Sequence, residues 1–241
     1  MRNILKITTL AMSLSVFFAC VSFGGCIDGS GQVKSETREV ASFSGINISG
    51  SADVFLTPGE TQSLTIQTDD NLLELITTDV KGQNLYIGNK KCFKTRNDVK
   101  IFITVPTLSD VTISGSSDVK GADLFKCGDL GLKISGSGNI TLAVDADDVD
   151  MSISGSGDME LKGSAEDLTI RISGSGGLNS RDLETKSVTA IISGSGDCMV
   201  NTTGDLNAVI SGSGDVTYFG NPKSVDTSIS GSGSVKKGTS F

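Results

Sequence analysis

The chain has 241 residues, thirty glycines, no histidine, no tryptophan and a formal net charge of −8. The absence of histidine excludes catalytic triads and metal sites that use an imidazole, and the acidic balance makes nucleic acid and anionic lipid poor partners. From the N-terminus, the sequence predicts a targeting segment, a short tether, an irregular β-rich part and a long series of repeats.

Residues 1–25 have the pattern of a lipoprotein-type signal peptide. Arg2 and Lys6 give a basic start, residues 7–23 are mostly apolar, and Gly24-Gly25 supply small residues before Cys26. We expect cleavage before Cys26 and lipidation of that cysteine. Cys20 is the competing lipidation site, and a plain secretory signal is the other alternative. The protein is then exported and lipid-anchored to the bacterial cell envelope, at the outer membrane.

Residues 26–37 are polar and small, which predicts a flexible tether. The folded domain is expected to cover residues 38–241. Its first part, 38–106, is β-rich but irregular, and includes a degenerate copy of the repeat at Ile48. We expect this part to cap or extend one end of the domain, because a stack of repeats needs a cover on its terminal rung.

Residues 107–241 are dominated by the regular repeat Ile-Ser-Gly-Ser-Gly-Asp. Successive copies from Ile113 onward start 21, 19, 19, 20, 18 and 19 residues apart, and a near-constant period of this size indicates a solenoid. Around Ile153, apolar and polar residues alternate strictly, as in half-buried strands. The copies begin at Ile48, Ile113, Ile134, Ile153, Ile172, Ile192, Ile210 and Ile229.

The repeats predict an all-β fold, a right-handed parallel β-helix or β-solenoid with rungs of about 19 residues. One repeat cannot bury its apolar row alone, whereas stacked repeats can. The two glycines of each motif are interpreted as a corner whose interior has no room for a side chain. A sandwich of hairpins is the alternative, disfavoured because copies in identical register should run in the same direction.

Three cysteines lie within the expected domain. Cys198 occupies an inward position of its repeat, which predicts a buried core thiol. Cys92 and Cys127 are able to pair in an oxidising compartment, and the sequence leaves this open.

The outward residue after each corner forms a column of mostly acidic side chains. Within it, Asp197 and Asp215 are neighbouring carboxylates and the candidates for a weak cation site. Solvated or turn-bonding aspartates are the favoured alternative. We expect no cofactor and no catalytic residue, because the acids recur with the fold. The column reads Asp118, Asn139, Asp158, Gly177, Asp197, Asp215 and Ser234.

A second outward column precedes the motif and becomes apolar at two adjacent rungs. Arg171, Ile191 and Val209 lie in it and form a candidate contact patch. The alternative is that the irregular part or a loop covers them.

The chain resembles the family of putative auto-transporter adhesins with a head GIN domain, from about Arg38 to the C-terminus. The resemblance implies an exported lipoprotein with a β-solenoid body, and supplies no catalytic residues. We therefore expect a non-catalytic adhesin or ligand-binding protein whose partner is a surface glycan or protein. A structural spacer and a polysaccharide-active enzyme are the alternatives. The resemblance is carried by Phe43-x-x-Ile46-x-Ile48-Ser49-Gly50-Ser51-x-Asp53-Val54-x-Leu56, by Asn71-Leu72-Leu73, by Val105-Pro106 and by the repeats.

Overall fold

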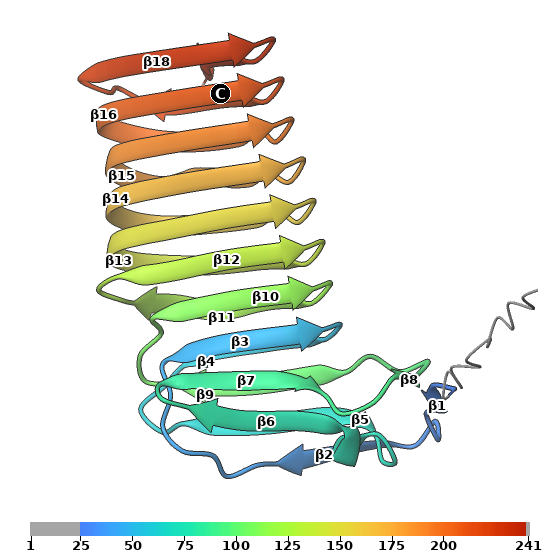
Figure 1. Cartoon of the computed structure of the whole chain (residues 1–241). Helices are drawn as coiled ribbons and strands as arrows, with labels where there is room; N and C mark the ends of the chain where they lie inside the picture. Colours follow the sequence, from blue (N-terminus) through green and yellow to red (C-terminus); the bar gives the residue numbers. More distant parts are fainter. Residues whose placement is uncertain (1–24, 240–241) are drawn as a thin grey trace, which may run out of the picture.

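The computed structural model describes residues 25–239, and their strands stack into a tall β-solenoid (Figure 1). About 70% of the structure is strand, in about seven turns spaced near 19 residues. The described residues contain one 3₁₀ turn, Leu73–Leu75, and no α-helix. Within this range, no helix has the length and apolarity needed to cross a membrane. The predicted all-β solenoid is confirmed.

One face of the solenoid is a parallel ladder built from the repeated motif. Ile48 of β3 (Gly45–Gly50) lies beside Ile113 of β10 (Asp110–Gly115), although they are far apart in the chain. Ile113 in turn lies beside Ile134 of β12 (Leu130–Gly136). The same register continues through every later copy of the motif. This parallel register excludes the sandwich of hairpins, in which neighbouring copies would run in opposite directions.

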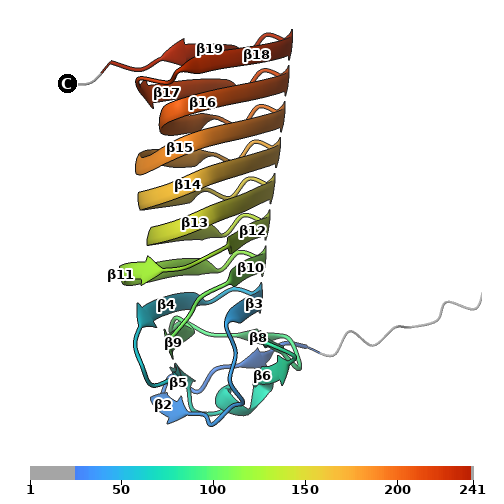
Figure 2. The same cartoon turned by 90° about the vertical axis from the view of Figure 1, so that its left-hand side faces the viewer.

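In the regular part, a long strand covers most of each rung. It starts after one corner, passes through a smooth bend and ends at the next corner, so that the chain closes one turn (Figure 2). The long strands are β13 (Asn139–Gly155), β14 (Met159–Gly174), β15 (Leu178–Gly194) and β16 (Cys198–Gly212). The last rungs are divided into β17 (Asp215–Gly220), β18 (Ser224–Gly231) and β19 (Ser234–Lys237), and the first into shorter strands that include β4 (Asp53–Pro58) and β11 (Asp118–Lys126).

The interior is a column of aliphatic side chains from alternate positions. Met151, Ile153 and Met159 are buried, and this inward parity passes through the corner, where Gly155 is half-buried and Gly157 is buried. Each buried side chain stacks on its equivalent in the next rung, so a single apolar core extends along the whole stack.

The corner glycines are required mainly by the neighbouring rung. Gly155 has φ of +136°, and a Cβ on it would lie 2.2 Å from the carbonyl oxygen of Gly136. A Cβ on Gly157 would lie 2.1 Å from the oxygen of Gly138 and 2.8 Å from Cγ2 of Ile134. The expectation of a crowded interior therefore holds only for the second glycine. For the first, the obstacle is the backbone of the rung below.

Antiparallel strands close the N-terminal end of the solenoid. β7 and β9 still run parallel to β3 and β4, but β6 and β5 pair with them in the reverse direction, and β2 adds to β5. A small sheet of β1 and β8 lies beside this cap (Figure 1). The expectation of a flexible tether over residues 26–37 is therefore wrong, because β1 and β2 lie in that range and pair with strands of the cap region. The bounds are β1 Ile27–Asp28, β2 Val33–Thr37, β5 Ser63–Asp69, β6 Ile76–Lys81, β7 Asn84–Asn89, β8 Phe93–Lys94 and β9 Lys100–Val105.

Candidate functional site

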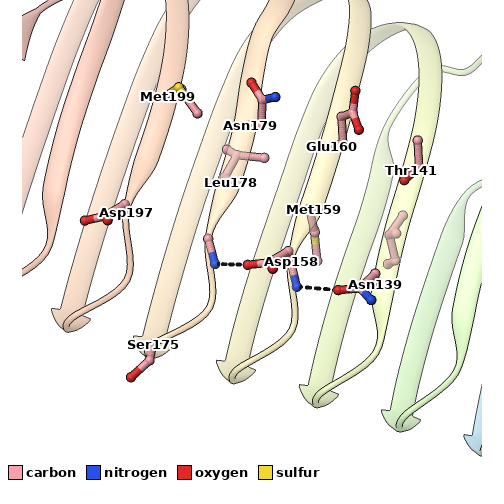
Figure 3. A pocket seen from close by; sticks show the side chains of 12 residues that line it. Asn139, Thr141, Asp158, Met159, Glu160, Ser175, Leu178, Asn179, Asp197 and Met199 are labelled. Atoms are coloured by element: carbon pink, nitrogen blue, oxygen red, sulfur yellow. Dashed lines mark hydrogen bonds between the residues drawn. The ribbon is translucent and has the colours of Figure 1, made fainter.

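The outward residue after each corner belongs to a hydrogen-bonded ladder. The Asn139 amide donates to Asp118 Oδ1 at 3.2 Å, and the Asp158 amide donates to Asn139 Oδ1 at 3.1 Å. The Gly177 amide donates to Asp158 Oδ1 at 2.8 Å (Figure 3). Each side chain thus accepts the amide proton of the equivalent residue one rung further on. This accounts for the acidic column structurally, because a charged acceptor strengthens such a bond.

The same ladder engages the two aspartates proposed for a cation site. The Asp215 amide donates to Asp197 Oδ1, and the Ser234 amide and hydroxyl both donate to Asp215 Oδ1, each at 2.8 Å. Lys236 Nζ lies 3.5 Å from the other oxygen of Asp215. Donation from Ser234, with Lys236 nearby, lowers the pKa of Asp215. Within residues 25–239 no three acidic or cysteine side chains gather to hold a metal ion, so the geometry favours the turn-bonding alternative.

The ladder is interrupted at Gly177, which has no side chain to accept the next amide. Asp197 N–H therefore lacks the side-chain acceptor that its equivalents have, and none of the hydrogen bonds found among the described residues uses it. A Cβ atom on Gly177 would lie 3.2 Å from Asp158 Oδ1 and 3.3 Å from the carbonyl oxygen of Asp197. The interruption leaves a gap the size of one small polar side chain, with an exposed donor beside it.

An open groove of about 520 Å³ surrounds this gap and extends over four rungs (Figure 3). The ladder forms one border, and the next outward column forms the other. That second column consists of Thr141, Glu160, Asn179 and Met199. Buried Ile140, Met159 and Leu178 lie between the columns as the floor.

Acidic and amide groups dominate the polar lining of the groove, and no basic side chain lines it. Glu160 is the one acid there with a cation close by, since Lys162 Nζ lies 2.9 Å from its Oε1. Met199 is 39% exposed and provides an apolar contact surface. The groove therefore suits a polar ligand that is neutral or cationic, and disfavours an anion.

The predicted contact patch lies on the other side of the corners, on β14 to β16. Arg171, Ile191 and Val209 are neighbours in register, and Arg171 Nη1 lies 3.4 Å from Asp150 Oδ1. Ile191 is 40% exposed and Val209 37%, so the alternative that the irregular part or a loop covers them is wrong. Their role as a contact surface stays a prediction.

The cysteines differ from the sequence-based expectation. Cys26 forms a disulfide with Cys92, and Cys127 is free and half-buried. A sulfur in a disulfide cannot also carry a lipid, so the predicted lipidation of Cys26 is wrong for this structure, and Cys92 does not pair with Cys127. Cys20 lies outside the described residues. Cys198 is buried as predicted, and burial raises the pKa of its thiol to about 12.

A polar cluster in the cap was not predicted. Asp69 is 1% exposed and accepts hydrogen bonds from Thr95 Oγ1 and Asn97 Nδ2, both at 2.6 Å. Those bonds lower the pKa of Asp69. The cluster fixes the segment after β8 against the end of β5. Only the adjacent acids Asp69-Asp70 hinted at it in the sequence, because the partners come from a distant loop.

Comparison with known proteins assigns the chain to a family. The family model for the putative auto-transporter adhesin, head GIN domain, matches residues 42–222. The chain belongs to this family. The predicted resemblance is thus confirmed, and the head GIN region includes the groove, most of the cap and every member of the ladder except Ser234. None of the curated proteins compared with this chain matches it.

Solved structures share the head GIN fold. A putative adhesin from Bacteroides fragilis NCTC 9343 is 27% identical with a TM-score of 0.84, covering 88% of this chain and 99% of that one. A putative lipid binding protein from Parabacteroides distasonis ATCC 8503 is 26% identical with a TM-score of 0.75, covering 89% and 100%. A putative adhesin from Parabacteroides merdae ATCC 43184 is 23% identical with a TM-score of 0.71, covering 88% and 99%, and shows the same fold.

Proposed function

We propose that this head GIN protein is an exported cell-surface adhesin that binds a neutral, hydroxyl-rich ligand, such as a glycan, without catalysis. The observation that carries the proposal is the gap in the ladder at Gly177, set in the centre of a groove over β13 to β16. Elsewhere in the ladder, each side chain accepts the amide of the next rung. At Gly177 this bond is missing, so the amide of Asp197 is left for a ligand.

The groups around the gap match the chemistry of a sugar hydroxyl. A hydroxyl both accepts and donates, so it can accept from Asp197 N–H and donate to the carboxylate of Asp158. The exposed part of Met199 offers apolar contact to the C–H face of a sugar ring. A regular solenoid repeats similar columns every rung, which suits an extended or repetitive ligand.

The absence of catalysis is proposed from the same ladder. Asp158 and Asp197 recur with the repeat and each accepts a backbone amide, while Glu160 pairs with Lys162, which explains the acids of the groove without an acid–base role. The chain also has no histidine. We expect no change in any polysaccharide incubated with the purified protein. Product formation that a single substitution of Asp158 or Glu160 abolishes would overturn this part of the proposal.

The groove is tested with Gly177→Asn, which keeps the rung but fills the gap. Glycan-array screening of the wild type identifies a ligand, and calorimetry then measures its affinity for each variant. We expect at least a tenfold loss with Gly177→Asn and no change with the matched control Ile191→Ser/Val209→Ser, on the other side of the corners. Unchanged affinity in Gly177→Asn would refute the groove.

A second candidate function is protein binding through Arg171, Ile191 and Val209. The exposure of two neighbouring branched apolar side chains favours it. In that case the double serine variant loses binding to a protein partner and Gly177→Asn retains it. If the wild type binds neither glycans nor proteins, a role as a structural spacer is favoured instead.

We propose further that the protein is anchored to the outer membrane through Cys20. Cys20 follows Phe17-Phe18-Ala19 in the apolar segment, and it remains available for a lipid because Cys26 is committed to Cys92. Metabolic labelling with a fatty acid should mark the wild type and Cys26→Ala, but not Cys20→Ala. Label retained in Cys20→Ala would refute this anchor.

A further inference from the structure

The C-terminal rung leaves the apolar core without a cover. β18 pairs with β16 on one edge, and no other strand among residues 25–239 pairs with its second edge. Val225 lies beside Leu206, and Ile229 lies beside Ile210, so both occupy inward positions. Yet Val225 is 39% exposed and Ile229 43%, whereas Leu206 and Ile210 are each 1% exposed. The last layer of the core is therefore exposed to solvent at the C-terminal end of the stack.

The two strands at the C-terminal end of the stack, β18 and β19, differ in how they are protected. β19 carries Lys236 and Lys237, and lysine on a free edge discourages pairing with another chain. Their ammonium groups contact Asp215 and Asn221 of the rung below. β18 contains no lysine, no proline and no bulge, and its pairing with β16 is unbroken. It thus presents a regular row of unpaired backbone groups next to an exposed apolar surface.

The sequence of β18 is complementary to itself when it is reversed. Val225-Asp226-Thr227-Ser228-Ile229 has an apolar residue at each end, polar residues inside them and Thr227 at the centre. An antiparallel pair centred on Thr227 places Val225 of each copy opposite Ile229 of the other. It also places Asp226 opposite Ser228, so no like charges face each other directly. The alternation keeps inward positions opposite inward positions.

We propose that β18 pairs with β18 of a second copy of this chain, in an end-to-end dimer with two-fold symmetry. Such a contact continues the sheet from one solenoid into the other, with Val225 and Ile229 covering each other across the joint. In an antiparallel ladder, directly opposed residues alternate between hydrogen-bonded and non-hydrogen-bonded pairs. The two copies of Thr227 can form either kind of pair, so both are compatible with a two-fold axis at this residue.

The geometry predicts a weak and reversible contact. Eight residues of β18 span ~26 Å, and two packed sheets are ~10 Å apart, so the end face is small. It is well below the ~800 Å² per partner of a standard interface. Because the edge hydrogen bonds and two apolar pairs carry it, we expect dimers only at high protein concentration. The pairing does not use the groove and is independent of the function proposed above.

Sedimentation equilibrium up to ~1 mM protein tests the dimer, a range chosen for a weak complex. We expect a reversible monomer–dimer equilibrium for the wild type and at least a tenfold weaker association for Val225→Lys/Ile229→Lys. The matched control is Val33→Lys, which adds a lysine to the exposed edge strand β2 at the opposite end and should dimerise like the wild type. Thermal unfolding verifies that each variant is folded.

Hydrogen exchange of the wild type supplies a test without mutation. Amides of residues 224–231 should become more protected as the protein concentration rises, and those of β2 should not. A wild type that stays monomeric, or filaments instead of dimers, would refute the proposal. So would loss of association in Val33→Lys, or protection confined to the cap.

Discussion

The amide of Ser156 donates to the carbonyl oxygen of Gly136, 2.9 Å away on the preceding rung. The equivalent bond joins Ser175 to Gly155, also at 2.9 Å, so backbone hydrogen bonds link successive corners along the stack. The bond requires the two backbones to touch, which leaves no space for a Cβ on the first glycine of the motif. The first glycine of the motif is therefore required in each copy by backbone contact between neighbouring rungs.

Substituting Gly155 should be severely destabilising. Gly155→Ala combines a positive φ with a Cβ that would lie 2.2 Å from a backbone oxygen, and we expect a loss of about 3 kcal/mol or more. Urea unfolding measures it. Gly128→Ala is the control, because the nearest atom to its Cβ would be Asp147 Oδ2 at 3.9 Å. Equal effects of the two variants would show that the corner does not depend on glycine.

Removing one whole rung should leave a folded protein. Deletion of residues 149–167 joins Asp148 to Leu168, and the register lets the flanking rungs pair as they do now. Circular dichroism should show a cooperative β protein with a modestly lower melting temperature. Deletion of 149–157, about half a rung, should prevent folding. Similar behaviour of both deletions would contradict the independence of rungs.

Gly177→Asn should stabilise the protein. Asn139 already serves as a member of the ladder, and an equivalent side chain at position 177 can accept from Asp197 N–H. One net hydrogen bond contributes about 0.5–1.5 kcal/mol. Gly177→Ala is the control, because it adds the Cβ without an acceptor. Asn less stable than Ala would show that the side chain cannot reach the amide.

Asp69 should make the stability of the cap dependent on pH. Hydrogen bonds from Thr95 and Asn97 lower its pKa in the folded state below the ordinary value of 3.8. Its contribution is therefore present above that value and is lost as the pH falls through the folded pKa. Asp69→Asn should be less stable than the wild type at pH 7, and the difference in urea midpoint should shrink by pH 3. A difference independent of pH would exclude the carboxylate as the cause.

The disulfide should stabilise the N-terminal end. It joins Cys26 to Cys92 across 66 residues, and Cys92→Ser should cost about 2–4 kcal/mol. Thermal unfolding measures the loss, and peptide mapping without reductant identifies the bond. Cys127→Ser serves as control because Cys127 is free. A Cys92→Ser protein as stable as the wild type would show that the bond does not constrain the unfolded chain.

The sequence by itself determined the solenoid, its period and the inward parity of each strand. This was possible because each rung contacts only its neighbours, so the same contact must be written into every copy of the motif. Ile48 shows how far this extends, since its copy takes its place beside Ile113 despite the long cap segment between them. The buried position of Cys198 followed from the same alternation.

Only the tertiary structure decided the contacts between segments that do not belong to the repeat. The pairing of Cys26 with Cys92, and the bonds of Thr95 and Asn97 to Asp69, depend on how a loop returns to the cap, and no period predicts that. Gly177 was visible as a break in the acidic column, but its meaning required the ladder geometry. The ladder made the break a gap because each side chain accepts an amide from the next rung, and only the stacked backbone shows which amide is left without an acceptor.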